Sequence, residues 1–529
     1  MEKIDNLIKG KGLHIALIML TFFVIYRMFV IGSIHSEREL PIEVDDAYVY
    51  ISQAHMFYDN YDRTKETTSS VISIAKLTLE NDTSDNVQNV SRYYGWAAHQ
   101  AYYLYSATFG FFTEILNINP VKVWWSFAYI TQILVALSVA LMINLYMGTN
   151  RIPLIIASIL CAFISIEVVH QITATPLTIA NSILLIGWYF LNKSIKSKVL
   201  WLVGGTLIAL ALHVHPGAFV IFGLLSFSSL VFWYLGFEHK EHYRNIFFFS
   251  VSMVLFIVMI ESLLVYVFNG DRYLSVVGYK ALASVRHDMT LIELLSYNFY
   301  ETKERLKDFT DLNSFKNLGI YIFLFSLYVT YKLNTKVFII NLVFLLGNIV
   351  GLLHYLPYHR GELIEYIGQS QLIFIAMAFS YLYFRIIQFV KNNNKRNMLN
   401  IVILIIFSTF IINKYQSTVS QIESRSSRHN FENDTLKIKE FIESLPKDTS
   451  VIIGDEFVYI MMLSEISNRH IMLADHMRKG GKSWSIPGDF PPPSGYIGKP
   501  LKSVLVAGKK YELVSHSHSN RIIFSKIEL

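Results

Sequence analysis

Three carboxylates lie close together near the start of the chain. Glu43 is followed by the adjacent Asp45 and Asp46 in the segment PIEVDDA. Adjacent carboxylates at a membrane surface repel each other and lose hydration, which raises the pKa of one of them or recruits a cation. An ionised carboxylate here could take the proton from an acceptor hydroxyl, and the pair could help to hold a divalent metal. The alternative is that Asp45 or Asp46 caps a helix that begins at Ala47.

Histidine and arginine side chains recur in two short connections between apolar segments. The connection HVHPGA contains His213 and His215, and the connection HYLPYHRGE contains His359 and Arg360. Imidazole nitrogens can ligate a divalent metal, and Glu43 is the carboxylate that would complete such a site with His213 and His215. The metal would be Mg, Mn or Zn. The alternative for each histidine is an ordinary polar residue at the membrane interface.

Arg360 is the strongest candidate for holding a phosphate, because its guanidinium is always charged and suits phosphate oxygens. His359 precedes it directly, and Arg286 is a further candidate in a longer polar segment, where a solvated loop explains it equally well. Trp96 and Trp124 could stack on a sugar ring or on lipid, although aromatic belts at membrane interfaces explain such residues as often.

The composition indicates a polytopic membrane protein. The 529 residues are 53% hydrophobic and 16% charged, whereas ordinary soluble domains are about 25% charged. This composition argues against both a soluble globular protein and a disordered chain. The single cysteine, Cys161, excludes an intramolecular disulfide framework and a zinc ribbon. The net charge of +6 is small and dispersed, so we expect no nucleic-acid partner.

Apolar runs predict eleven membrane-spanning helices, since a bilayer requires about 20 mostly apolar residues per span. Every second connection is short and basic, which places these connections and the N-terminus in the cytoplasm. The carboxylates, the histidine connections and the C-terminal segment then fall on the outer side. The predicted spans are 13–33, 121–146, 152–170, 177–191, 199–212, 216–236, 246–268, 317–331, 337–355, 363–388 and 398–414.

Three longer segments are expected on the outer side. Residues 1–414 form the transmembrane module, which includes outer loops at 34–120 and 269–316. The first loop contains aromatic, amphipathic stretches that favour helices lying in the interface plane. Residues 415–529 predict a small α/β domain of normal size. Its expected elements are strands at 449–454, 470–474, 503–507, 511–516 and 521–528, a helix at 456–467 and a loop at 479–500.

Taken together, these features resemble the GT-C superfamily of integral-membrane glycosyltransferases. They are one N-terminal span, a long outer loop opening with VDDAYVYISQA, several spans with short loops, a later outer loop and an outer C-terminal α/β domain. The resemblance in architecture covers essentially the whole chain, whereas the residue match is limited to the motif Asp45-Asp46-Ala47. A WWD signature typical of oligosaccharyltransferases does not occur in the C-terminal segment, which argues against transfer of whole glycans to asparagine.

The resemblance implies an enzyme that moves a sugar from a polyprenyl-phosphate donor to a hydroxyl of a glycan, lipid or protein acceptor. Asp45 or Asp46 would be the general base, and the configuration of the sugar would invert. Arg360, with His359, would stabilise the charge that grows on the leaving lipid phosphate. Some members of the superfamily use a divalent metal and others do not. We expect an integral protein of the bacterial inner (plasma) membrane that acts in cell-envelope glycan or glycolipid assembly, among membrane lipids.

Two other functions fit parts of the sequence. A flippase or transporter for lipid-linked glycans would carry internal repeats and ionisable residues within its spans. The Asp-Asp segment is not repeated, and Glu261 is the main ionisable residue noted within a predicted span. A polymerase or ligase for surface polysaccharide would centre on a large late outer loop with arginines, for which 269–316 could serve.

Overall fold

The protein is represented by a computed structural model. The structure describes helical residues and turns at 12–37, 103–112, 116–118, 120–148, 151–163, 175–215, 217–268, 296, 318–353, 362–390, 394–395, 397–402 and 440, and strand residues at 451–454, 471–473, 477–479, 482–484, 503–506, 509–516 and 522–526. The chain divides into two compact units, which are described separately. Unit 1 comprises Met1–Ile34 and Ala128–Val419, and unit 2 comprises His35–Phe127 and Ser420–Leu529.

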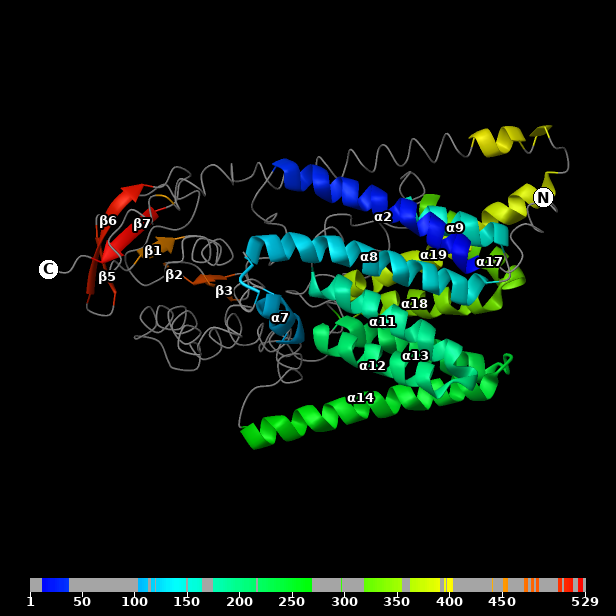
Figure 1. The fold of residues 1–529 in the computed structure, drawn as a ribbon, viewed down its shortest axis with the longest axis horizontal. Coiled ribbons are helices and arrows are strands. Elements are labelled where there is room, and N and C mark those ends of the chain that lie inside the picture. Colours follow the sequence, from blue (N-terminus) through cyan, green and yellow to red (C-terminus); the bar gives the residue numbers. More distant parts are fainter. Residues whose placement is uncertain are drawn as a thin grey trace. The chain divides into compact units, whose positions relative to one another are not determined.

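Long apolar helices make up the described part of unit 1 (Figure 1). Four helical segments are long and apolar enough to cross a membrane: Lys122–Met147, Gly217–Tyr234, Lys240–Ile260 and Ser370–Phe389. Shorter apolar helices lie between them in the sequence. The helices are α2 (Gly12–Glu37), α8 (Pro120–Met147), α9 (Arg151–Phe163), α11 (Pro176–Lys193), α12 (Lys198–Val214), α13 (Gly217–Tyr234), α14 (Lys240–Phe268), α17 (Leu318–Leu333), α18 (Thr335–Leu353) and α19 (Glu362–Phe389).

Most of these helices lie within a few residues of the predicted spans, because an apolar run of bilayer length is a strong signal. Some ends extend further than predicted. α14 begins at Lys240 instead of residue 246, and α12 ends at Val214 instead of residue 212. Helices can continue through the polar interface beyond the hydrocarbon core, where polar side chains are solvated. The span at 398–414 is described only as far as residue 402, so the total of eleven spans stays a prediction.

Among the described helices of unit 1, α11 and α12 pack most closely. A single turn of 3₁₀ helix, η3 (Ser194–Lys196), joins the two helices. Gly187 and Gly204 face each other so closely that a Cβ atom on Gly204 would lie 2.8 Å from the Gly187 carbonyl oxygen. Small residues that let two backbones approach are a common means of packing helices in membranes.

Polar contacts join several helix ends at one end of unit 1, here called the basic end. It consists of the last turns of α8, α11 and α17 and the first turns of α12, α14 and α18. Trp188 Nε1 donates to the Tyr146 hydroxyl at 2.9 Å, and Asn334 Nδ2 donates to the Tyr146 carbonyl oxygen at 2.8 Å. The His242 Nε2 and the Leu191 carbonyl oxygen lie 3.2 Å apart. Basic side chains of this end are Lys193, Lys196, Lys198, Lys240, Arg244, Lys332 and Lys336.

The opposite end of unit 1, here called the histidine end, carries His215 in the turn between α12 and α13. α17 and α18, like α11 and α12, form a hairpin, so these helices lead away from the basic end and back to it. A Cβ atom on Gly347 of α18 would lie 2.8 Å from Leu224 of α13 and 3.4 Å from Ile367 of α19. These three residues therefore lie at the same height along the helix bundle, and each is close to one end of its helix. α13 and α19 begin, and α18 ends, at the histidine end.

In unit 2, aromatic side chains pack helix α7 (Tyr103–Gly110) against the start of α8. The rings of Phe109 and Phe127 lie 5.4 Å apart, and those of Phe109 and Trp124 lie 6.5 Å apart. Trp124 is only 1% exposed, which leaves no ring face for a sugar or a lipid. The ligand-stacking alternative for Trp124 is therefore wrong, and this side chain contributes to packing.

The C-terminal part of unit 2 contains a five-stranded sheet in the order β2-β1-β7-β6-β5. Its strands are β1 (Val451–Gly454), β2 (Ile471–Leu473), β5 (Ser503–Val506), β6 (Lys509–His516) and β7 (Ile522–Lys526), all near predicted strands. β1 and β2 are parallel and the other neighbours are antiparallel. A parallel pair requires a crossover connection, which agrees with the predicted helix at 456–467; that helix lies outside the described residues.

A second pair of strands contradicts the predicted loop at 479–500. β3 (Met477–Lys479) and β4 (Lys482–Trp484) pair antiparallel, with Met477 opposite Trp484. The sequence places two glycines between them, at 480–481. A Gly-Gly pair between two short runs is typical of a two-residue hairpin turn. The prediction of a loop rested instead on the many prolines and glycines that follow.

Candidate functional site

Only two of the predicted site residues, His213 and His215, lie in the described part of the chain. The predicted base residues, the phosphate ligands and the carboxylate of the metal site lie outside it: Glu43, Asp45, Asp46, Arg286, His359 and Arg360. The described helices nevertheless show at which end of unit 1 each of these segments is attached.

His215 lies in the turn between α12 and α13 and is buried, at 4% exposed. Its Nδ1 atom accepts a hydrogen bond of 2.9 Å from the backbone N–H of Gly217. The backbone N–H of His215 in turn donates to the Ala211 carbonyl oxygen at 3.2 Å. The side chain thus satisfies one of the first N–H groups of α13, which have no partner inside the helix. Nδ1 of His215 is thus occupied and is not available to ligate a metal.

His213 lies on the last turn of α12 and not in the connecting loop, because α12 continues to Val214. Backbone geometry therefore separates the two histidines: His213 is helical, and His215 is in extended backbone with φ −154°. Within the described residues, no group of three or more potential metal ligands occurs. The predicted metal site also needs Glu43, so it stays a prediction.

The segment with Asp45 and Asp46 begins where α2 leaves unit 1. Arg27 Nε of α2 donates to Gln132 Oε1 of α8, and a Cβ atom on Gly32 would lie 3.8 Å from the Tyr129 hydroxyl. As residue numbers rise along α2 they fall along α8, so the two helices are antiparallel. The C-terminal turn of α8 belongs to the basic end, and α2 therefore leads to the histidine end.

The remaining predicted segments start at the same end of the bundle. α18 ends at Leu353 and α19 begins at Glu362, and the connection between them carries His359 and Arg360. α14 starts at the basic end and therefore also leads to the histidine end, where the segment with Arg286 follows. Each chain segment with a predicted site residue thus begins or ends at the histidine end of unit 1.

Asn181 on α11 is a polar residue of this region that the sequence analysis missed. It is 4% exposed, and neither atom of its side-chain amide has a hydrogen-bond partner among the residues that the structure describes. The first two turns of α11 are polar as well, since Thr178 and Ser182 are buried there and the Thr175 and Thr178 hydroxyls lie 2.8 Å apart. Burying an amide without a partner is costly, which points to a role other than stability.

We predict that Asn181→Leu raises the free energy of unfolding by about 1–3 kcal/mol, because it removes a buried polar group that has no described partner. If the amide serves the activity of this end, the same variant will lose activity. Thermal unfolding in detergent and a transfer assay measure the two effects.

Asn192→Leu is the matched control for this prediction. Asn192 is buried on the same helix, but its Nδ2 donates to the Trp188 carbonyl oxygen at 2.9 Å. Its replacement should not stabilise the protein. Equal changes in stability for the two variants would contradict the interpretation of Asn181.

Arg27 is the second polar residue that the sequence analysis missed. It lies inside the apolar helix α2 and is only 2% exposed. Its partner Gln132 is fully buried, and Gln132 Nε2 donates to the Ala128 carbonyl oxygen at 3.2 Å. Ionisable residues within membrane spans are costly and often functional. Hydropathy averaged over a span does not reveal one such residue.

Comparison with known protein families finds no family that matches the chain, and comparison with curated proteins finds no relative.

Proposed function

We propose that the chain is a membrane glycosyltransferase. It would move a sugar from a polyprenyl-phosphate donor to an acceptor hydroxyl at the outer face of the membrane. The observation that supports this most is the common origin of the predicted site segments at the histidine end of unit 1. A lipid-linked donor lies with its reactive phosphate at the membrane surface, so its enzyme needs a base and phosphate ligands at one end of its helix bundle.

The proposed reaction assigns a role to each predicted residue. Asp45 or Asp46 accepts the proton of the acceptor hydroxyl, whose oxygen attacks the anomeric carbon. The bond between that carbon and the phosphate oxygen breaks, and the lipid phosphate leaves from the opposite face, so the configuration inverts. Arg360 and His359, with Arg286, stabilise the charge of the departing phosphate. His213, His215 and Glu43 are the candidate ligands of a divalent metal.

The finer features of fold and location belong to the same proposal. The full complement is eleven membrane-spanning helices, with the basic end in the cytoplasm and the histidine end outside. The sheet of unit 2 is then part of a small α/β domain on the outer side. The large number of lysines and arginines at the basic end supports this orientation, because short cytoplasmic loops are rich in both residues. The protein would reside in a bacterial plasma membrane.

A flippase or transporter for lipid-linked glycans is the second candidate. The buried Arg27–Gln132 pair favours it, because charged residues within spans often mark a substrate pathway. Arg27 lies well inside α2, about ten residues before the helix ends at Glu37. The same pair could also fix the packing of α2 on α8 without touching a substrate.

Mass spectrometry of cell-envelope glycans and lipid-linked sugars, with and without the protein, distinguishes the candidates. A glycosyltransferase predicts that its absence removes one sugar from otherwise intact glycans and that a single-sugar lipid donor accumulates. Accumulation of complete lipid-linked glycans with no missing sugar would contradict the glycosyltransferase and support the transporter. Restoring the gene in the same strain is the control.

A further inference from the structure

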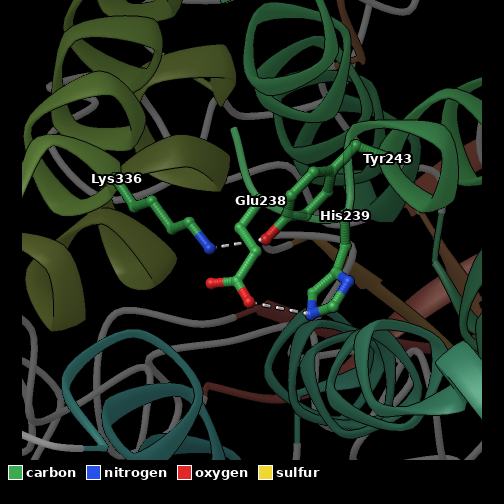
Figure 2. A network of polar contacts seen from close by, with 4 residues as sticks. All are labelled: Glu238, His239, Tyr243 and Lys336. Atoms are coloured by element: carbon green, nitrogen blue, oxygen red, sulfur yellow. Dashed lines mark hydrogen bonds and ion pairs between the residues drawn. The ribbon is translucent and has the colours of Figure 1, made fainter. Parts of the chain in front are cut away.

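A cationic side chain at the basic end has an unusual set of neighbours. Lys336 lies in the first turn of α18, and its Nζ donates to the Tyr243 hydroxyl of α14 at 2.8 Å (Figure 2). The same Nζ lies 5.2 Å from the centre of the Tyr243 ring and 5.8 Å from that of the Phe237 ring. Lys336 is half-buried and Tyr243 is buried. Two aromatic rings and one hydroxyl thus hold an ammonium group between α14 and α18.

The carboxylates near this position are engaged elsewhere. Glu238 pairs with His239 at 3.5 Å and its side chain is 86% exposed, and Glu241 pairs with Arg244 at 2.7 Å. Within the described part of the chain, no carboxylate lies within ion-pair distance of Lys336 Nζ. A partly desolvated cation is stabilised by aromatic faces, but its charge still lacks an anion.

The donors at this position outnumber the acceptors. The ammonium of Lys336 has three N–H groups and no acceptor atom, and only one of these N–H groups is used by Tyr243. The Tyr243 hydroxyl accepts that bond and keeps its own proton to donate. Two donor groups, one on α14 and one on α18, can therefore reach the same oxygen-rich anion. A phosphate offers several oxygens and the negative charge that this arrangement lacks.

The depth of the site favours a lipid as the source of the phosphate. The apolar run of α18 begins directly after Lys336, and that of α14 begins three residues after Tyr243. Both residues thus lie where the apolar segments begin. The boundary between an apolar segment and its polar flank is the level of the lipid headgroups.

We propose that Lys336 and Tyr243 bind the phosphate of an anionic membrane lipid between α14 and α18. The ammonium supplies the charge, the Tyr243 hydroxyl supplies a directed hydrogen bond, and the Phe237 and Tyr243 rings confine the ammonium. The other basic residues of this end attract anionic lipids by their field, whereas this pair would hold one lipid in a defined place. The site is separate from the proposed transfer chemistry, which belongs to the histidine end.

The test uses purified full-length protein and native mass spectrometry, with phosphatidylglycerol and phosphatidylcholine as the two probes. Wild-type protein should retain phosphatidylglycerol in preference to phosphatidylcholine. Lys336→Met should lower that retention by about tenfold or more, since it removes a charged donor. Tyr243→Phe keeps the ring but removes the hydroxyl, and it should lower retention by a smaller factor. Lys336→Arg should preserve it.

Lys332→Met is the matched control, because Lys332 is exposed at the same end and is placed 5.1 Å over the Tyr331 ring. It should leave phosphatidylglycerol retention unchanged. Equal loss for Lys332→Met and Lys336→Met would overturn the proposal in favour of diffuse attraction. If millimolar glycerol phosphate displaces the lipid and binds as tightly as phosphatidylglycerol, the site binds a soluble phosphate and the proposal of a lipid ligand is wrong. Thermal unfolding of each variant identifies any that fails to fold.

Discussion

Asp45→Asn or Asp46→Asn is expected to lower the rate of sugar transfer by about 10²- to 10⁴-fold, the range typical for removing a general base. Asparagine keeps the size of the side chain but cannot accept the proton of the acceptor hydroxyl. The residue that acts as base should give the larger loss, while its neighbour gives a smaller one through the local charge. The measurement is transfer from a polyprenyl-phosphate sugar in membranes that contain equal amounts of each variant.

Glu43→Gln is the control, because it removes a nearby carboxylate that is assigned only to the metal site. If no metal takes part, this variant should retain most of the activity. If a metal is required, Glu43→Gln should lose activity that added Mn²⁺ or Mg²⁺ restores in part. Unchanged transfer in both aspartate variants, at normal protein levels, would contradict the assignment of the base.

The helices of unit 1 were the most predictable part of the fold. The bilayer fixes the length of an apolar span, so a run such as that of α8 reveals its position with no knowledge of its neighbours. The start of α14 was missed because Lys240, His242 and Tyr243 are polar, although the helix includes them. Their contacts explain this: the His242 ring is 3.2 Å from the Leu191 carbonyl oxygen, and Tyr243 accepts from Lys336. Both partners are distant in sequence.

The candidate site was less predictable than the helices that lead to it. The spacing of His213 and His215 drew attention to the pair, but it could not show that Nδ1 of His215 is occupied by the Gly217 N–H. That contact depends on the backbone path between α12 and α13. Asn181 and Arg27 were missed because the mean hydropathy of a span changes little when one of its residues is polar. Their burial depends on which face of the helix packs inward, and this is a tertiary property.

The close approach of α11 and α12 predicts a large loss of stability when a side chain is added there. A Cβ atom on Gly204 would lie 2.7 Å from the Leu191 backbone nitrogen and 2.8 Å from the Gly187 carbonyl oxygen. Both are backbone atoms inside a helix, and neither can move without separating the two helices. Side-chain atoms, in contrast, can often rotate away from an added methyl group.

Gly204→Ala is therefore expected to lower the free energy of unfolding by about 1–3 kcal/mol, the usual cost of overpacking, despite the advantage of about 1 kcal/mol that alanine has in a helix. Gly205→Ala, on the next residue, would meet only the tip of the Phe249 ring at 3.0 Å and should have a smaller effect. Gly223→Ala on α13 meets nothing within 4 Å and should be neutral or stabilising. Thermal unfolding of the three variants in one detergent measures this order. If Gly204→Ala is as stable as Gly223→Ala, the α11–α12 contact does not have the geometry described.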